Sequence, residues 1–178
     1  MKKSDIKKIV ADAMNPVSFC KVLFKYDVNY RYCFPLAVSD KFFLSAVEDE
    51  FLINGYTIRR FCDTKDVHIV EGKFQEMFVA EGVIGSLDTP CIDITDWYSV
   101  FVSLKKMNKN IIVEKEDKDE DDWLFAIGEI AKVTKTKVYM KHFDADGIWQ
   151  DELWGIPYTQ ITSVSFGSRY VEVFSKYV

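Results

Sequence analysis

The chain has 178 residues, which is the length of one domain or of two very small ones. Hydrophobic residues make up 48% and charged residues 29%, so the chain can bury a core and is not intrinsically disordered. Its 23 basic and 28 acidic residues give a net charge of −5, which argues against a broad phosphate-binding face.

Targeting and membrane signals are weak. No apolar run approaches the roughly 20 residues that a bilayer span requires, and no apolar segment follows the lysines at the start. The four cysteines are far apart and form no CxxC pair, so two disulfides are conceivable but nothing indicates an oxidising compartment. We therefore expect a cytoplasmic protein without membrane contact, whose cysteines are buried free thiols. They are Cys20, Cys33, Cys62 and Cys91.

The first half predicts one helix followed by strands. Ser4 or Asp5 can cap the helix, apolar residues recur within it at helical spacing, and Pro16 ends it. The segments that follow are rich in aromatic and β-branched residues, and the last two form an expected hairpin around Glu71-Gly72. The expected strands are 17–27, 30–38, 41–47, 51–61, 67–72 and 73–82.

The second half repeats this order. Thr95 or Asp96 can cap a helix over 97–109, in which Trp97, Val100, Phe101 and Leu104 form one apolar face. Strand-like segments follow, as in the first half. They are 110–117, 123–133, 136–143, 147–156, 163–168 and 169–178.

Landmarks recur between the halves at an offset of about 93 to 96 residues, which is the pattern of an internal repeat. The paired landmarks are Met14-Asn15 with Met107-Asn108, 39–41 with 135–137, Gly72 with Gly167, and Phe74 with Tyr170. We therefore predict two tandem units over 1–80 and 95–178, joined by a linker over 81–94. Each is expected to hold an N-terminal helix and a strongly bent five-stranded antiparallel sheet that closes into a small barrel, which removes exposed edges.

A helix followed by five strands, with a tight turn between the last two, resembles the Sm-like fold. The resemblance is carried mainly by 127–147 and 164–174, and the stretch 143–170 is also similar to segments of uncharacterised bacterial proteins with small-barrel folds. For an RNA-binding member, the resemblance implies an Asp and an Asn in one loop and a basic residue before a later Gly. Here 143–147 has no Asn, and Phe166 precedes Gly167.

Two motifs have alternative interpretations. The segment 144–147 has the DxDG pattern of a calcium loop, but His142 and Leu153 would then occupy positions that need oxygen ligands. We therefore expect a turn in which Gly147 supplies the positive φ. The acidic run over 114–122 is either a solvated loop or a surface that attracts a basic partner or a cation.

No motif of catalysis or phosphate binding is present, and His68 and His142 lack the spacing of a metal site. The expectation is a protein that is not an enzyme and has no catalytic residues, metal or cofactor. A Ser/His or Cys/His pair that meets only in space stays open.

The candidate binding site is a predicted final hairpin with a two-residue turn at Gly167-Ser168. Alternation along the returning strand would expose Arg169 and bury Tyr170. One of two tryptophans, expected on opposite faces of a single strand, would lie beside it. The site residues are Phe166, Gly167, Ser168, Arg169, Tyr170, Trp149 and Trp154.

Two functions are compatible with these features. Neither half is basic, with 12 basic against 13 acidic residues in 1–90 and 11 against 15 in 91–178. We therefore favour a small-barrel interaction or assembly protein that binds a protein partner or itself. The alternative is an Sm-like RNA-binding protein, in which Arg and Lys gather with exposed aromatic rings.

Overall fold

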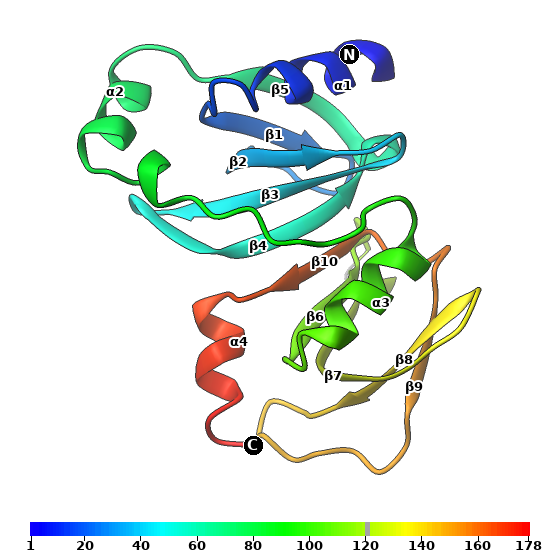
Figure 1. The fold of residues 1–178 in the computed structure, drawn as a ribbon. Helices are drawn as coiled ribbons and strands as arrows, with labels where there is room; N and C mark the ends of the chain where they lie inside the picture. The colour runs from blue at the N-terminus through cyan, green and yellow to red at the C-terminus, as the bar shows by residue number, and fades with distance from the viewer. Residues whose placement is uncertain (120–121) are drawn as a thin grey trace. The chain divides into compact units, whose positions relative to one another are not determined.

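A computed structural model describes residues 1–119 and 122–178. The chain is mainly β with helices, as expected, and divides into two compact units over Met1–Pro90 and Cys91–Val178. We describe each unit by itself (Figure 1). The division falls within 81–94, but the first unit continues ten residues past the end that we expected for it.

The first unit is a five-stranded antiparallel sheet with helices at both ends of its sequence. The strands are hydrogen-bonded in the order β5-β1-β2-β3-β4. Its elements are α1 (Lys3–Asp12), β1 (Cys20–Phe24), β2 (Arg31–Val38), β3 (Phe42–Asp49), β4 (Leu52–Arg60), the 3₁₀ turn η1 (Phe61–Asp63), β5 (Thr64–Ile69), α2 (Lys73–Ala80) and the 3₁₀ turn η2 (Ile84–Ser86).

The second unit has the same order of elements, from helix through five antiparallel strands to a final helix. Its strands are hydrogen-bonded in the order β10-β6-β7-β8-β9, which matches the first unit strand for strand. Its elements are α3 (Trp97–Lys106), β6 (Ile111–Lys115), β7 (Leu124–Val133), β8 (Lys137–His142), β9 (Trp154–Pro157), β10 (Ser163–Phe166) and α4 (Arg169–Phe174).

The expected closure into barrels is not found. Among the described strands of each unit, the hydrogen-bonded order has two ends, β5 and β4 in the first and β10 and β9 in the second. Bulges bend both sheets: the register shifts between Pro35 and Ala37 in β2, and between Ile130 and Lys132 in β7. These two bulges lie 95 residues apart, at the same place in the two sheets.

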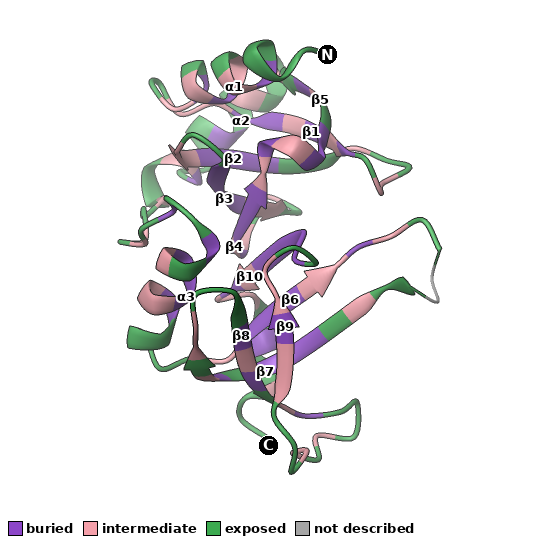
Figure 2. Cartoon of the chain, turned by 90° about the vertical axis from the view of Figure 1, so that its right-hand side faces the viewer, coloured by how far each residue is buried: buried purple, intermediate pink, exposed green. Residues whose placement is uncertain are grey.

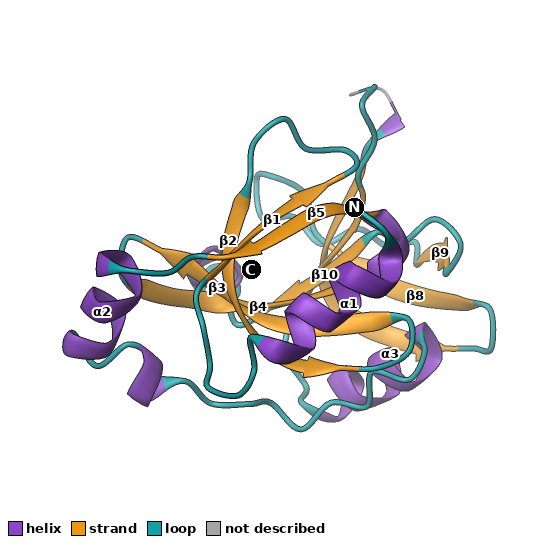
Figure 3. Cartoon of the chain, turned by 90° about the horizontal axis from the view of Figure 1, so that it is seen from above, coloured by secondary structure: helices purple, strands orange, loops and turns teal. Residues whose placement is uncertain are grey.

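Three expected strands are wrong. Segment 73–82 contains α2, segment 169–178 contains α4, and the strand expected over 147–156 is reduced to β9. The helices α1 and α3 are confirmed, and the Asp96 carboxylate caps α3 by accepting a hydrogen bond from the Ser99 amide at 2.8 Å. Figure 3 distinguishes the helices, in purple, from the strands, in orange.

The sheet of the first unit buries side chains on both faces. Neighbouring residues of an extended chain point to opposite faces of a sheet, so Cys20 and Phe19 lie in different clusters. Cys20 packs with Ile6 and Val10 of α1. Phe19 packs in another cluster with Phe78 of α2 and Val83 beyond it. Figure 2 marks the buried residues of these strands in purple. Two helices at opposite ends of the unit's sequence therefore cover two different faces of its sheet.

The expectation of buried free cysteines is partly met. All four cysteines are free, but only Cys20 and Cys33 are buried, whereas Cys62 is half-buried and Cys91 is exposed. None of the helices in the described part of the chain is both long and apolar enough to cross a bilayer.

Candidate interaction surfaces

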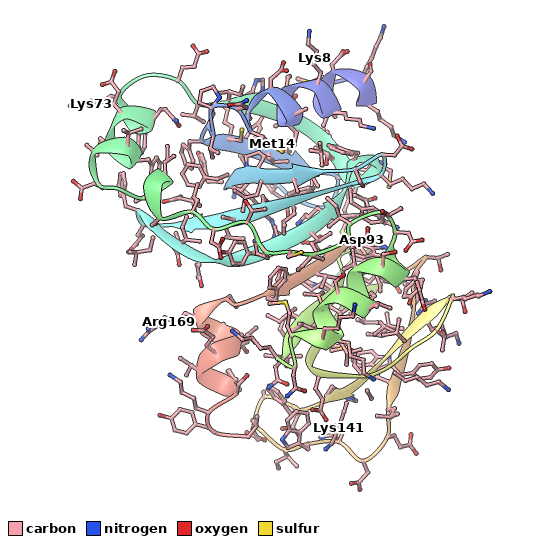
Figure 4. All side chains as sticks on the ribbon, viewed as in Figure 1. Lys8, Met14, Lys73, Asp93, Lys141 and Arg169 are labelled. Atoms are coloured by element: carbon pink, nitrogen blue, oxygen red, sulfur yellow. The ribbon has the colours of Figure 1, made fainter. Side chains whose placement is uncertain are left out.

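The structure places the predicted site residues at the start of a helix rather than on a hairpin. Gly167 has φ +67°, and the Ser168 hydroxyl then accepts a hydrogen bond from the Val171 amide at 3.4 Å, which caps α4. Phe166 ends β10 and is buried, whereas Arg169 begins α4 and is exposed (Figure 4). The predicted hairpin is wrong because a serine cap and a glycine turn redirect the chain into a helix.

Tyr170 is 52% exposed, so its expected burial is also wrong. Its ring lies 4.8 Å from that of Phe174, one helical turn on, and Phe174 lies 5.9 Å from Phe143. Trp149 packs edge-on against Phe143 at 5.0 Å. The structure thus joins two predicted site residues, Tyr170 and Trp149, through a chain of ring contacts. We call these four residues the second-unit aromatic cluster.

Trp154 lies outside this cluster. It begins β9 and packs against the His142 ring at 5.2 Å. Trp149 instead precedes β9 and forms only an isolated bridge with Phe143, so the two tryptophans do not share a strand as expected. The Lys141 ammonium lies 5.0 Å from the centre of the Trp149 ring (Figure 4 labels Lys141), which is a cation–π contact.

A more open aromatic surface lies on the first unit, and our sequence analysis missed it. It is a groove of about 380 Å³, here called the first-unit groove. Tyr32 is 45% exposed and Phe74 is 55% exposed, so two neighbouring large rings of the groove are open to water. The lining residues are Phe19, Lys21, Tyr32, Glu48, Val70, Phe74 and Phe78.

Strands and α2 together position these rings. The Phe19 ring stacks on Tyr32 at 5.4 Å and on Phe74 at 6.5 Å, and Phe74 stacks on Phe51 at 6.3 Å. Phe51 adopts φ +63° at the tip of the β3–β4 hairpin, a conformation that is costly for a bulky residue. The Glu48 carboxylate offsets part of that cost, since it accepts a hydrogen bond from the Phe51 amide at 2.9 Å.

Gln75 fastens α2 beside the groove. Its side-chain carbonyl accepts a hydrogen bond from the Phe19 amide at 2.8 Å, and its side-chain amide donates to the Val17 carbonyl at 3.1 Å. Both groups belong to the segment that leads from α1 into β1, where no neighbouring strand satisfies them. The position of Phe74, one residue before Gln75, is therefore fixed by hydrogen bonds as well as by packing.

A sequence signal for the groove was present. Phe74 and Phe78 are four residues apart, as are Tyr170 and Phe174, and this spacing places both rings of each pair on one face of a helix. Phe74 and Tyr170, which the repeat analysis paired, are each the second residue of the final α-helix of their unit. The β-forming character of these residues obscured the helical spacing.

The first acids of the acidic run lie in β6 or directly after it, where a strand was expected, rather than in the loop that follows. The Thr162 hydroxyl lies 3.1 Å from the carboxylate of Glu116, which is buried, and the Ser163 hydroxyl donates to the Glu114 carboxylate at 2.8 Å. These two acids therefore stabilise the β6–β10 pair. The part of the run at 120–121 lies outside the described residues.

The DxDG turn and the buried cysteines have structural explanations. The turn at 144–147 is confirmed, with φ +77° at Gly147 and two backbone amides donating to the Asp144 carboxylate. Burial raises the pKa of the Cys33 thiol to about 11 and raises that of Cys20 as well, so both thiols stay protonated. In ranges 1–119 and 122–178, no three His, Cys, Asp or Glu side chains gather as metal ligands would.

Comparison with known proteins adds no assignment. No family model matches the chain, and searches of curated proteins and of solved structures return no significant match.

Proposed function

We propose that the chain is a non-enzymatic interaction protein built from two tandem Sm-like units, and that it binds another protein chain through the first-unit groove. The half-exposed pair of rings, Tyr32 and Phe74, carries this proposal. Aromatic side chains that bury on binding are the commonest energetic anchors of protein interfaces.

The arrangement of each unit supports the Sm-like part of the proposal. Each has a helix, then five antiparallel strands in the same hydrogen-bonded order. In the first unit the tight 3₁₀ turn η1 joins the last two strands, as the resemblance implies. The bulges 95 residues apart support a tandem repeat, because the position of a bulge is a specific feature of a sheet.

The groove is suited to a protein segment. Its lining includes the buried Phe19 ring and other apolar side chains, and its charged residues, Lys21 and Glu48, have opposite signs. One positive and one negative charge at a largely apolar groove suit the mixed polarity of a polypeptide better than the uniform negative charge of RNA.

The test is site-specific photo-crosslinking in the intact chain. A photo-reactive benzoylphenylalanine replaces Phe74, and the matched control replaces Tyr177, which is 84% exposed and lies outside the groove. We expect a cross-link from position 74 to one defined peptide of a second copy or of a partner, mapped by mass spectrometry. Equal cross-linking from both positions, or a cross-link to RNA, would refute the proposal.

RNA binding is the second candidate, and one observation favours it. In the second-unit aromatic cluster, Trp149 is paired with the Lys141 ammonium, and rings beside cations suit single-stranded bases. Short RNA oligomers should then bind with an affinity that falls as salt rises, and Arg169→Ala should weaken that binding. An Arg169→Ala variant that binds RNA like the wild type would remove this candidate site.

A further inference from the structure

The first unit has a second hollow, on the side where α1 packs, with a volume of about 340 Å³. We call it the basic hollow because four basic side chains line it, from α1, the β2–β3 turn and the end of β4. They are Lys3, Lys7, Lys41 and Arg60. In a chain of net charge −5, this concentration of cations is local and stands out.

Two of the four cations are neutralised within the unit. The Lys7 ammonium donates to the Asp40 carboxylate at 2.8 Å, and this hydrogen bond holds the pKa of Asp40 below its usual value. The Arg60 Nε donates to the Asp63 carboxylate, which also accepts from the Tyr26 hydroxyl at 3.3 Å. Neither the Lys7–Asp40 pair nor the Arg60–Asp63 pair therefore adds net charge to the hollow.

The other two cations, Lys3 and Lys41, are exposed and leave the hollow with a net charge of about +2. A carboxylate would balance half of this charge. A phosphate monoester carries close to two negative charges at neutral pH and offers three acceptor oxygens. Arg60 adds further donors, since its Nε is the atom bound to Asp63 and a guanidinium has five N–H groups.

From this charge balance, we propose that the basic hollow binds a phosphate monoester. Lys3 and Lys41 supply the balancing charges, and Arg60, held in place by Asp63, supplies oriented donors. This site goes beyond the proposed function, because it uses different residues from the first-unit groove. Its ligand is either a small phosphate ester or a phosphorylated side chain.

The lysines that α1 contributes to the hollow have no counterpart in α3. The ten-residue helices α1 and α3 correspond at an offset of 94 residues, so Lys3 and Lys7 correspond to Trp97 and Phe101. Those two residues are buried and apolar. The basic lining is therefore a property of this part of the sequence and not a consequence of the fold.

The experiment is a calorimetric titration of the intact chain at constant ionic strength with inorganic phosphate, phosphoserine and adenosine monophosphate. We expect Lys3→Gln/Lys41→Gln to weaken binding at least tenfold. Lys8→Gln is the matched control, because Lys8 is an exposed lysine of α1 outside the hollow (Figure 4); we expect a change below twofold. Preference for one of the two esters identifies the source of the phosphate.

A second measurement uses a side chain of the hollow itself. Cys62 lines the hollow, whereas the exposed Cys91 does not, so a bound ester should slow alkylation of Cys62 and leave Cys91 unchanged. Three results would overturn the proposal. They are equal weakening by Lys8→Gln, binding of neither ester, and equally tight binding of an RNA oligomer that has only phosphodiesters.

Discussion

Gly72 and Gly167 lie 95 residues apart and both have positive φ, +84° and +67°; Gly72 directly precedes α2, and only the cap residue Ser168 separates Gly167 from α4. Each turns the chain out of the last part of the sheet and into a helix that carries an aromatic pair. Both units thus have, at this point, a positive φ that glycine adopts without the steric cost that a Cβ would add.

The positive φ predicts that a methyl group added at Gly72 lowers stability. Gly72 has ψ −148°, in a region reserved almost entirely for glycine, so we expect Gly72→Ala to lower the free energy of unfolding by about 1–3 kcal/mol. Gly85→Ala is the control, because a Cβ added at either glycine would meet no atom within 4 Å and only Gly72 has a positive φ. Urea denaturation of both variants makes the comparison. Equal effects would show that φ is not the cause.

We expect Gln75 to contribute more to the free energy of unfolding than a half-buried polar residue usually does. Gln75→Ala removes the partners of the Phe19 amide and the Val17 carbonyl, so we expect a loss of about 1–3 kcal/mol in unfolding free energy. Gln160→Ala, at an exposed position, should change stability by less than about 0.5 kcal/mol. Amide hydrogen exchange supplies the local measurement. Unchanged exchange of the Phe19 amide in Gln75→Ala would contradict this role.

The buried thiols predict a loss of stability at alkaline pH. Burial raises the pKa of Cys33 from 9.0 to about 11, and that of Cys20 also rises, so both thiols ionise in the unfolded chain before they ionise in the folded one. The stabilising effect is complete below pH 9 and is lost as pH rises from there toward 11, with a slope of about 1.4 kcal/mol per pH unit for each thiol. Denaturation midpoints between pH 7 and 11 measure this slope. It should flatten in Cys20→Ala/Cys33→Ala, and an unchanged slope would assign the effect to other groups.

Thr162 connects β10 to the acidic run. Its hydroxyl accepts a hydrogen bond from the Glu116 amide at 2.9 Å and lies 3.1 Å from the Glu116 carboxylate. Thr162→Val keeps the shape but removes the hydroxyl that contacts the buried Glu116 amide and carboxylate, so we expect a loss of about 1–3 kcal/mol in thermal or urea unfolding. The same change at exposed Thr159 should have little effect. If both variants unfold alike, the carboxylate of Glu116 is satisfied without Thr162.

The sequence predicted those parts of the fold whose local signals agree with one another. Asp96 before the apolar face of α3 combines a cap with helical spacing, and the structure has both. Strands β1 to β4 were expected because aromatic and β-branched residues crowd between turns. In these regions local preference and tertiary packing favour the same structure.

The final helices were missed because their signals conflict. Segment 169–174, RYVEVF, is composed largely of good strand formers, and the Ser168 cap and the Gly167 turn decide its structure instead. The first-unit groove could be predicted only in part, because the spacing of Phe74 and Phe78 marks one face of a helix but not what that face meets. It needs Tyr32 and Phe74, from β2 and α2, to meet over Phe19, and that is a tertiary contact.

The C-terminal boundary of the first unit decides which part of the gene encodes that unit in full. Phe78 and Val83 cover Phe19, Phe34 and Ala46 on one face of the sheet, although they follow the last strand in sequence. A shortened chain that stops after β5 at Ile69 would expose that aromatic face to water and invite aggregation. Expression of the first unit alone therefore requires the DNA that encodes residues 1–90.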